Sequence, residues 1–285
     1  MTKKFTDKKV IITGGSGGIG SAIAAGFLRE GAHVLILGRD KEKLLKKQKE
    51  LGKISPKIEI RVTDVSDRRQ AKKMGVFIKN QFGAQVDVLV NAAGIYGPIG
   101  KLEELDLDLW QRAIEVNLLG TVQMCALVIP FMKKRWRGKI INFSGGGDGA
   151  FPRFSAYSAS KGAILRFTES LAAELVKYNI FVNAVAPGAV NTGLLEEVLK
   201  AGISKVGRDF YLASKKQKTQ GGVSPDKVRD LLLFLASEQS GNLTGKTISA
   251  VRDNWKDIPK HLKMLTKTDI YNTRKIKPQD RGYDW

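Results

Sequence analysis

Cysteine and histidine are scarce in this sequence of 285 residues, which holds one cysteine and two histidines. Cys125 alone excludes a framework of internal disulfides and fits a reducing compartment. Because Cys125 falls in an apolar helical stretch, we expect it to be a small buried hydrophobic residue. His33 and His261 lie far apart in the sequence and form no metal-ligand pattern, so no metal site is predicted.

The sequence also lacks long apolar runs. None is long enough to cross a membrane, and residues 1–7 have no apolar core of a signal peptide. We therefore expect a cytoplasmic protein with no membrane partner. The length favours one large domain or a domain with an appendage, and a hydrophobic fraction of 42% allows a sizeable core.

Acidic residues are few relative to basic ones: the sequence has 28 Asp and Glu against 48 Lys and Arg, which gives a net charge of +20. Such a charge is typical of nucleic-acid binders and of proteins that handle anionic substrates. The lysines, however, are spread through the expected surface helices and are not interleaved with aromatic residues. We predict a lysine-rich solvated surface and no nucleic-acid partner; the alternative would show steeply salt-dependent retention on polyanions.

Buried strands alternate with helical segments along most of the chain. We expect strands at 8–13, 33–37, 57–62, 86–90, 139–143, 180–186 and 246–251. Expected helices include 22–30, 41–51, 225–236 with Ser224 as N-cap, and 105–134 with Pro130 as its one kink or break. This alternation predicts an α/β fold, a Rossmann-like doubly wound parallel sheet with helices on both faces, in a single domain over residues 1–250. Residues 193–224 lose the alternation and are expected to be a mobile loop-and-helix segment.

A glycine-rich turn separates the first strand from the first helix. Residues 14–20 read Gly-Gly-Ser-Gly-Gly-Ile-Gly. Glycines let the backbone turn tightly and let a pyrophosphate approach the helix N-terminus, where free N–H groups and the helix dipole favour anions. The flanking strand and helix favour this interpretation over a glycine hinge without a ligand.

The end of the second strand bears on the choice of cofactor. An acidic residue there accepts bonds from the ribose hydroxyls of NAD, whereas a basic group accommodates the extra phosphate of NADP. Here Gly38 stands in the acidic position and Arg39 follows it, while Asp40 is better explained as a helix N-cap. NADP(H) is therefore favoured, with NAD(H) and a merely solvated Arg39 as alternatives.

Tyr157 and Lys161 lie four residues apart, so on a helix they share one face. A phenol with its ordinary pKa of ~10 is a poor acid or base near neutrality. An ammonium group one turn away favours the phenolate and brings that pKa toward the working range. The pair thus suggests acid–base catalysis, although an ordinary exposed helix start would read the same way.

In combination these patterns resemble the short-chain dehydrogenase/reductase superfamily over residues 8–250. The matching motifs are Thr13-Gly-x-x-x-Gly-Ile-Gly20, Asp64, Asn91-Ala-Ala-Gly94, Asn117, Ser144, Tyr157-x-x-x-Lys161, and Pro187-Gly188 with Thr192. The resemblance implies an oxidoreductase that transfers a hydride between a nicotinamide cofactor and a carbonyl or secondary alcohol. The hydride chemistry itself belongs to the cofactor.

The resemblance also implies which residues hold the cofactor. They would cradle the pyrophosphate, the adenine and its ribose, and orient the nicotinamide carboxamide. The implied set, with Arg39 from the strand-end argument, is Gly14, Ser16, Gly18, Ile19, Gly20, Arg39, Asp64, Val65, Asn91, Ala92, Gly94, Tyr157, Lys161, Pro187, Gly188, Val190 and Thr192.

Four residues would carry the catalysis by the same resemblance. Tyr157 would be the general acid for carbonyl reduction or the base for alcohol oxidation. Lys161 would hold the nicotinamide ribose and lower the Tyr157 pKa. Ser144 would stabilise the substrate oxygen, and Asn117 would hold a water in a proton relay to Lys161.

The serine position departs from the family pattern. The corresponding strand commonly ends in two serines, of which the second is catalytic, but here Ser144 is followed by Gly145. The strand alignment points to the second position, whereas the spacing of 13 residues to Tyr157 points to Ser144. We favour Ser144, because Gly145 has no side chain to donate.

The C-terminus departs too, because the chain continues through residues 251–285. This extension has a short helix candidate at 259–265 and four aromatic residues, Trp255, Tyr271, Tyr283 and Trp285. A disordered basic tail would carry less apolar surface. We expect the extension to pack over the substrate mouth or across a subunit interface.

Arg153 and the net charge favour an anionic or sugar-derived substrate, such as a sugar phosphate or nucleotide-linked sugar. The expected substrate contacts are Gly146, Arg153, Phe154, Tyr96 and the 193–215 segment. NADPH-dependent reduction of such a small-molecule carbonyl is the leading hypothesis.

A catalytically silent regulatory protein that still binds the cofactor is the alternative function. The intact Asn117, Tyr157 and Lys161 argue against it, because a silent site has no physical need for that triplet. By analogy with the family, a homodimer or homotetramer is expected, formed through the helices around 105–135 and 157–177.

Overall fold

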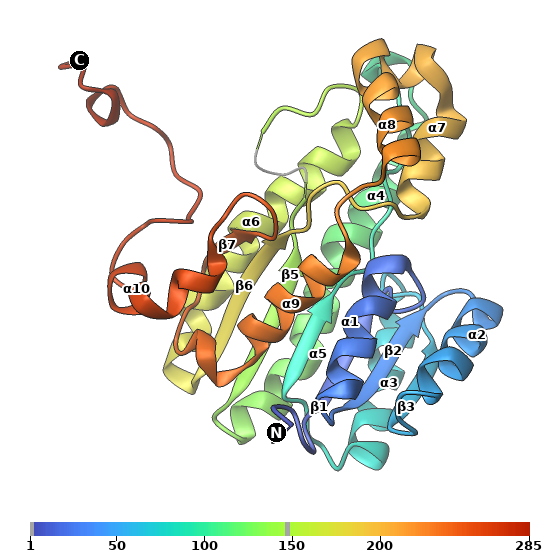
Figure 1. Cartoon of the computed structure of the whole chain (residues 1–285), viewed down its shortest axis with the longest axis vertical. Coiled ribbons are helices and arrows are strands. Elements are labelled where there is room, and N and C mark those ends of the chain that lie inside the picture. The colour runs from blue at the N-terminus through green and yellow to red at the C-terminus, as the bar shows by residue number, and fades with distance from the viewer. Residues whose placement is uncertain (1–2, 146–148) are drawn as a thin grey trace.

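Seven parallel strands form one sheet in the order β3-β2-β1-β4-β5-β6-β7 (Figure 1). The computed structural model describes residues 3–145 and 149–285, so the predicted substrate contact Gly146 lies outside the described residues. The strands are β1 (Lys9–Thr13), β2 (His33–Gly38), β3 (Ile58–Val62), β4 (Val88–Asn91), β5 (Gly138–Phe143), β6 (Ile180–Ala186) and β7 (Thr247–Ser249). The predicted doubly wound α/β sheet is confirmed.

Helices cover both faces of the sheet (Figure 1). One face carries α1 (Gly18–Arg29), α2 (Lys41–Gly52) and α9 (Pro225–Ala236), and the other carries α3 (Arg68–Gln81), α5 (Gly120–Lys134) and α6 (Ser155–Leu175). Successive strand residues point to opposite faces. Val10 and Ile12 therefore join the first core and Ile11 the second, which is why β1 is apolar at consecutive positions.

Helix starts follow from local side-chain chemistry. Asp40 accepts a hydrogen bond from the Lys43 N–H (3.0 Å) and Ser224 from the Asp226 N–H (3.2 Å), so both predicted N-caps are confirmed. Asp67 caps α3 in the same way, which the sequence analysis did not predict. Each cap satisfies an N–H group that the first helical turn leaves free.

The long helix predicted at 105–134 is interrupted at a different place from the one expected. Pro130 lies inside α5 without ending it, whereas a π-helical turn at 115–119 joins α4 (Leu107–Ile114) to α5. Such turns often mark functional sites, and this one holds Asn117. The expected break at Pro130 is therefore replaced by a π-helical turn at Asn117.

The span 107–134, taken through the π-helical turn, also corrects the expectation that no apolar stretch is long enough to cross a membrane. By length and composition alone, 107–134 is long and apolar enough to cross a membrane. Its buried residues, among them Met124, Val128 and Met132, instead pack in the core beneath the sheet. A helix that covers one face of a parallel sheet needs such an apolar stripe, and this accounts for the composition.

The segment 193–224 is mostly helical. It contains α7 (Gly193–Val206), interrupted by the non-helical Gly202 (φ 82°), and α8 (Arg208–Gln220), and the two lie beyond the sheet edge (Figure 1). The predicted loop-and-helix character is thus replaced by a pair of helices, while its predicted mobility stays a prediction.

The first part of the C-terminal extension packs on the domain. The Trp255 ring lies 5.6 Å from that of Phe234, and Ile258 and Leu265 of α10 (Ile258–Leu265) are buried in the core shared with α9. The Tyr271 carbonyl accepts a bond from the β7 N–H of Thr247 (2.9 Å). Thr273 then bonds to Glu169 and Arg166 of α6. After these contacts the chain runs away from the sheet to the C-terminus (Figure 1).

Candidate active site

The carboxyl ends of the parallel strands meet at one edge, where a cleft of about 1050 Å³ opens. Ligands of open α/β sheets bind at this edge, beyond the strand ends. The cleft is lined by residues predicted for the site, Ile19, Tyr96, Tyr157, Pro187, Gly188, Val190 and Thr192. The fold therefore brings together segments that lie far apart in the sequence.

The glycine turn between β1 and α1 leaves no room for a side chain at Gly14, Gly15 or Gly20. Gly14 has φ +65°, and a Cβ built on it would lie 2.8 Å from the Ala92 carbonyl oxygen. A Cβ on Gly20 would overlap the Gly14 oxygen. No side chain caps α1 at Gly17, so the first-turn N–H groups, from Gly18 onward, have no capping side chain. Such a turn fits a pyrophosphate at the helix N-terminus.

Ser16 and Arg39 both lie at the carboxyl end of β2. A Cβ built on Gly38 would lie 3.1 Å from Ser16 Oγ, so the missing side chain leaves space that the serine hydroxyl borders. Arg39 is exposed. Burial raises the pKa of Glu197 on α7, and the Arg39 charge opposes this rise, which places the two side chains within electrostatic range.

Tyr157 and Lys161 lie one turn apart on α6, as predicted. The Lys161 Nζ donates to the Phe143 carbonyl oxygen (2.9 Å) and lies 5.6 Å from the centroid of the Tyr157 ring. Burial lowers the pKa of Lys161 to about 8. Burial, with a smaller contribution from Tyr96, raises the pKa of the Tyr157 phenol.

This direction is opposite to the one predicted for Tyr157. The expectation was that the Lys161 ammonium lowers the phenol pKa, but desolvation dominates in the buried cleft and disfavours the phenolate. The ammonium is also engaged by the Phe143 carbonyl. In the protein alone Tyr157 is therefore a protonated phenol, which is the form that donates a proton.

Asn117 braces the site from the π-helical turn. Its Oδ1 accepts from the Ile95 N–H (2.8 Å), and its Nδ2 donates to the Ile95 carbonyl and to Ser160 Oγ (both 2.9 Å). The Ser160 hydroxyl donates to the Tyr157 carbonyl (2.7 Å). The side chain predicted to hold a water thus joins the loop after β4 to the helix of Tyr157, and the relay stays a prediction.

Gly94 belongs to the same cluster. A Cβ built on it would lie 3.2 Å from Asn117 Oδ1 and 3.5 Å from Lys161 Nζ. Any larger residue would therefore crowd both polar groups. The glycine of the Asn-Ala-Ala-Gly motif therefore lets the chain pass close to Asn117 and Lys161.

Asn91 has a structural role that the sequence analysis missed. Its Nδ2 donates to Asn142 Oδ1 (2.9 Å), and Asn142 Nδ2 donates to Thr168 Oγ1 (2.9 Å), so a buried ladder joins β4, β5 and α6. Its Nδ2 also approaches the sulfur of Cys125, which is buried as predicted. The signal was present in the sequence as asparagines inside two apolar strands.

Asp64 is held by protein groups. Its carboxylate accepts from Ser66 Oγ (2.6 Å) and pairs with Arg112 (2.5 Å). Although burial opposes it, these hydrogen bonds and the Arg112 charge hold the pKa of Asp64 below its usual range. Its neighbour Val65 is buried in the core. The predicted adenine contact therefore stays a prediction for a carboxylate that already has strong partners.

Ser144 follows β5 directly and is 3% exposed, whereas Gly145 lines the cleft. The Ser144 N–H donates to the Val185 carbonyl (3.0 Å), which continues the pairing of β5 with β6. The serine therefore lies just below the cleft surface, and its predicted contact with the substrate oxygen stays a prediction.

Two of the predicted substrate contacts have other roles. Arg153, at φ 68°, donates through Nη1 to the carbonyls of Ser204 (2.8 Å) and Lys205 (3.3 Å) at the end of α7. Phe154 is 0% exposed and lies behind the cleft wall. The carbonyls that Arg153 bonds to belong to α7, in the segment predicted as loop and helix. A contact of Arg153 with the substrate stays a prediction. Tyr96 does line the cleft.

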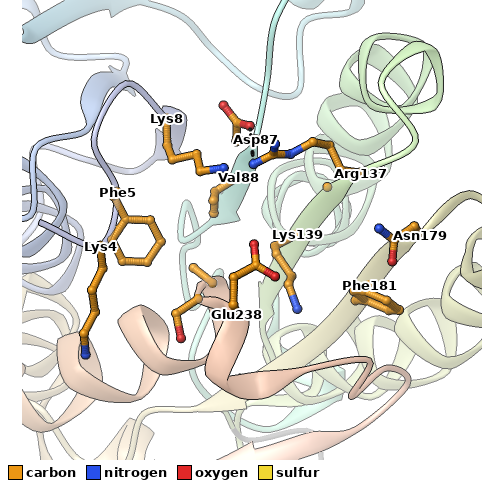
Figure 2. A pocket seen from close by; sticks show the side chains of 13 residues that line it. Lys4, Phe5, Lys8, Asp87, Val88, Arg137, Lys139, Asn179, Phe181 and Glu238 are labelled. Carbon is orange, nitrogen blue, oxygen red and sulfur yellow. Dashed lines mark ion pairs between the residues drawn. The ribbon is translucent and has the colours of Figure 1, made fainter. Parts of the chain in front are cut away.

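A second cavity of about 80 Å³ lies at the opposite, amino end of the strands (Figure 2). Arg137 pairs there with Asp87 (3.4 Å), and the Lys139 amine donates to Ser240 Oγ (3.0 Å) and to the Gly241 carbonyl (2.8 Å). Burial lowers the pKa of Lys139 to about 8. These basic side chains are thus engaged by protein groups.

A parallel dinucleotide-binding sheet with a tyrosine at the cleft on its carboxyl edge, and a buried lysine one helical turn from that tyrosine, defines a class of nucleotide-dependent oxidoreductases. Comparison with known proteins agrees. The sequence profile described as short chain dehydrogenase matches residues 8–202. The chain therefore belongs to the short-chain dehydrogenase/reductase family, and it is an NAD(P)-dependent enzyme.

Relatives in this family differ in what their names say they act on. The 3-oxoacyl-[acyl-carrier-protein] reductase FabG of Thermotoga maritima is 35% identical over 86% of this chain and 96% of its own. The 7alpha-hydroxysteroid dehydrogenase of Bacteroides fragilis is 32% identical over 86% and 93%. These relatives share the family but are named for different substrates.

Solved structures with bound cofactor resemble the whole domain. NAD+-bound xylitol dehydrogenase superposes with a TM-score of 0.80, at 26% identity over 87% of this chain and 98% of its own. The L-sorbose reductase of Gluconobacter frateurii, complexed with NADPH and L-sorbose, gives 0.77, at 28% identity over 87% and 97%. Both nicotinamide cofactors thus occur among structures of this fold.

Proposed function

We propose that the enzyme uses NADPH to reduce a carbonyl compound to a secondary alcohol. The observation that carries the proposal is the position of Tyr157, which lines the cleft one helical turn from the Lys161 amine and can donate its hydroxyl proton to a substrate oxygen. When bound, the nicotinamide cofactor supplies the hydride.

The residues of this chain then position the reacting groups and protonate the substrate oxygen. Tyr157 delivers its hydroxyl proton to the oxygen of the substrate, where negative charge develops. Lys161 provides a positive charge one turn away, held at Phe143. Asn117 fixes the helix of Tyr157 through Ser160, so the hydroxyl keeps its direction.

The preference for NADPH rests on the end of β2. Gly38 offers no carboxylate to the ribose of NAD, while Arg39 offers a cation and Ser16 a hydroxyl at the same strand end. A phosphate on the ribose would find both a charge and a donor there. A carboxylate at position 38 would instead repel that phosphate.

A titration of the protein with NADPH and NADH, followed by nicotinamide fluorescence, tests this preference. We expect tighter binding of NADPH and a loss of about tenfold in Arg39→Ala, since removing one charge-assisted contact is worth ~1.5–3 kcal/mol. Lys53→Ala, an exposed substitution just past the end of α2, is the matched control and should bind as the wild type does. Tighter binding of NADH would refute the preference.

A further inference from the structure

Aromatic rings form a continuous wall of the cleft beside Tyr157. The Tyr96 ring lies 4.7 Å from that of Tyr157, and the Phe151 ring lies 6.3 Å from it on another side. Phe210 of α8 lies 5.1 Å from Phe151 and extends the wall outward. Tyr96, Phe151 and Phe210 all line the cleft. We call these three residues the aromatic wall.

The buried Phe154 holds the aromatic wall together from behind. Its ring stacks on that of Phe151 (4.3 Å, 8° between planes) and contacts the rings of Tyr96 (5.1 Å) and Phe210 (5.2 Å) edge-on. The offset and edge-on arrangements are those that aromatic rings prefer. Each member of the wall therefore packs against one fully buried ring, and Phe210, which is 38% exposed, forms the outer end of the wall.

Arg153 fastens this assembly to α7. Its guanidinium bonds to the carbonyls of Ser204 and Lys205, and its own carbonyl accepts from the Gly100 N–H (2.9 Å). The loop that carries Phe151 is thus tied on one side to the segment before α4 and on the other to the helix pair that carries Phe210. A wall built in this way is preorganised for a flat partner.

Charge near the aromatic wall is committed to the protein. Arg153 bonds to backbone carbonyls, and Lys161 bonds to the Phe143 carbonyl. Arg274, which also lines the cleft, pairs with Asp269 (2.8 Å) and Asp280 (2.7 Å). Each of these three cations therefore has a protein partner beside the cleft.

From these contacts we infer that the substrate carries its carbonyl on, or directly beside, a flat apolar ring that stacks against the aromatic wall. The inference rests on the proposed function and adds to it the class of substrate. It replaces the anionic substrate expected from Arg153. A ring seated on Phe151 and Phe210 would hold the carbonyl at the Tyr157 hydroxyl, whereas a flexible chain would lose more conformational entropy there.

The test compares 2-tetralone, whose ketone lies in a six-membered ring fused to a benzene ring, with the open-chain 2-decanone of equal carbon number and with dihydroxyacetone phosphate. We expect kcat/KM for 2-tetralone to exceed the other two by about tenfold, since aromatic contacts add ~0.5–1.5 kcal/mol each beyond area burial. A preference for 2-decanone or for the phosphate would overturn the inference.

Substitutions of Phe210 separate a ring from mere apolar bulk. Phe210→Ala should remove most of the preference for 2-tetralone, and Phe210→Leu, which keeps apolar volume, should lower it by about threefold. Leu212→Ala, at a 49% exposed position on the same helix, is the matched control and should retain the preference. Equal selectivity in the alanine variant and the wild type would overturn the inference.

Binding of 2-naphthol, measured by calorimetry, tests the wall without any turnover. We expect wild-type protein to bind it and Phe210→Ala to bind it about tenfold more weakly. Absent or unchanged binding refutes the aromatic wall as a ligand site. If the protein reduces 2,3-butanedione with NADPH but does not prefer 2-tetralone, the inference fails while the proposed function stands. If the protein does not bind NADPH, the proposed function itself fails.

Discussion

The buried amine of Lys161 leads to a prediction about pH. Burial places its pKa at about 8 in the protein without cofactor. The side chain is then about 90% charged at pH 7 and about 10% charged at pH 9, because each pH unit changes the ratio of the two forms tenfold. If the charge is needed to bind and turn over cofactor, activity must fall as the pH rises through 8.

The sign follows from the direction of the shift. Desolvation disfavours the ammonium, so the proton is lost below the ordinary lysine pKa, and the alkaline limb lies near 8 instead of above 10. We expect kcat/KM for NADPH, which reports groups of the free enzyme, to fall about tenfold per pH unit above the limb. The assay is NADPH oxidation at 340 nm with a saturating ketone, from pH 6 to pH 10.

Two variants make this prediction refutable. Lys161→Arg keeps a positive charge throughout the range, so its lower activity should show no limb near 8. Lys139 is the matched control, because burial lowers its pKa to about 8 as well but it lies in the cavity at the other end of the strands. Lys139→Met should keep the wild-type limb. A flat wild-type profile, or a limb that moves in Lys139→Met alone, would refute the reasoning.

Three further predictions concern the cofactor site and the core. Gly38→Asp should shift the preference from NADPH toward NADH, because it puts a carboxylate at the strand end; unchanged NADPH titrations would contradict this. Asn142→Leu should lower the free energy of unfolding, measured by urea denaturation, by about 2–4 kcal/mol, since it removes the partner of the buried Asn91 and Thr168. A decrease of less than about 0.5 kcal/mol would contradict this prediction. Gly14→Ala should weaken cofactor binding and stability together, because its φ is +65° and Ala92 leaves no room; a variant with wild-type affinity would show that the turn adapts.

The sheet could be predicted from the sequence because its strands are buried on both faces and are separated by helices. The apolar runs at 10–12 and 34–37 are each followed by a glycine or a polar residue. In a chain without repeats, this pattern leaves little alternative to buried strands. Strand β6 was predicted to its ends, and the N-caps Asp40 and Ser224 followed from residue type alone. These features depend on local pattern, which the sequence carries.

The errors arose where tertiary packing decides. The expected lowering of the Tyr157 pKa considered one neighbouring charge and not the desolvation that the folded cleft imposes. Arg153 is predicted as a substrate contact from its charge, and its bonds to carbonyls at the end of α7 could not be predicted because they depend on how a distant segment packs. Phe154 is fully buried, in part because its ring packs against Phe210 of α8. Homodimer or homotetramer formation stays a prediction.

The most direct test of the central claim separates cofactor binding from proton donation in Tyr157→Phe. The account predicts that this variant binds NADPH within about twofold of the wild type, because only a hydroxyl is removed, and that single-turnover reduction of 2-tetralone or 2,3-butanedione slows by ~10²–10⁴-fold, the contribution of a positioned general acid. Turnover at the wild-type rate with intact binding would contradict the assignment of Tyr157 as the acid.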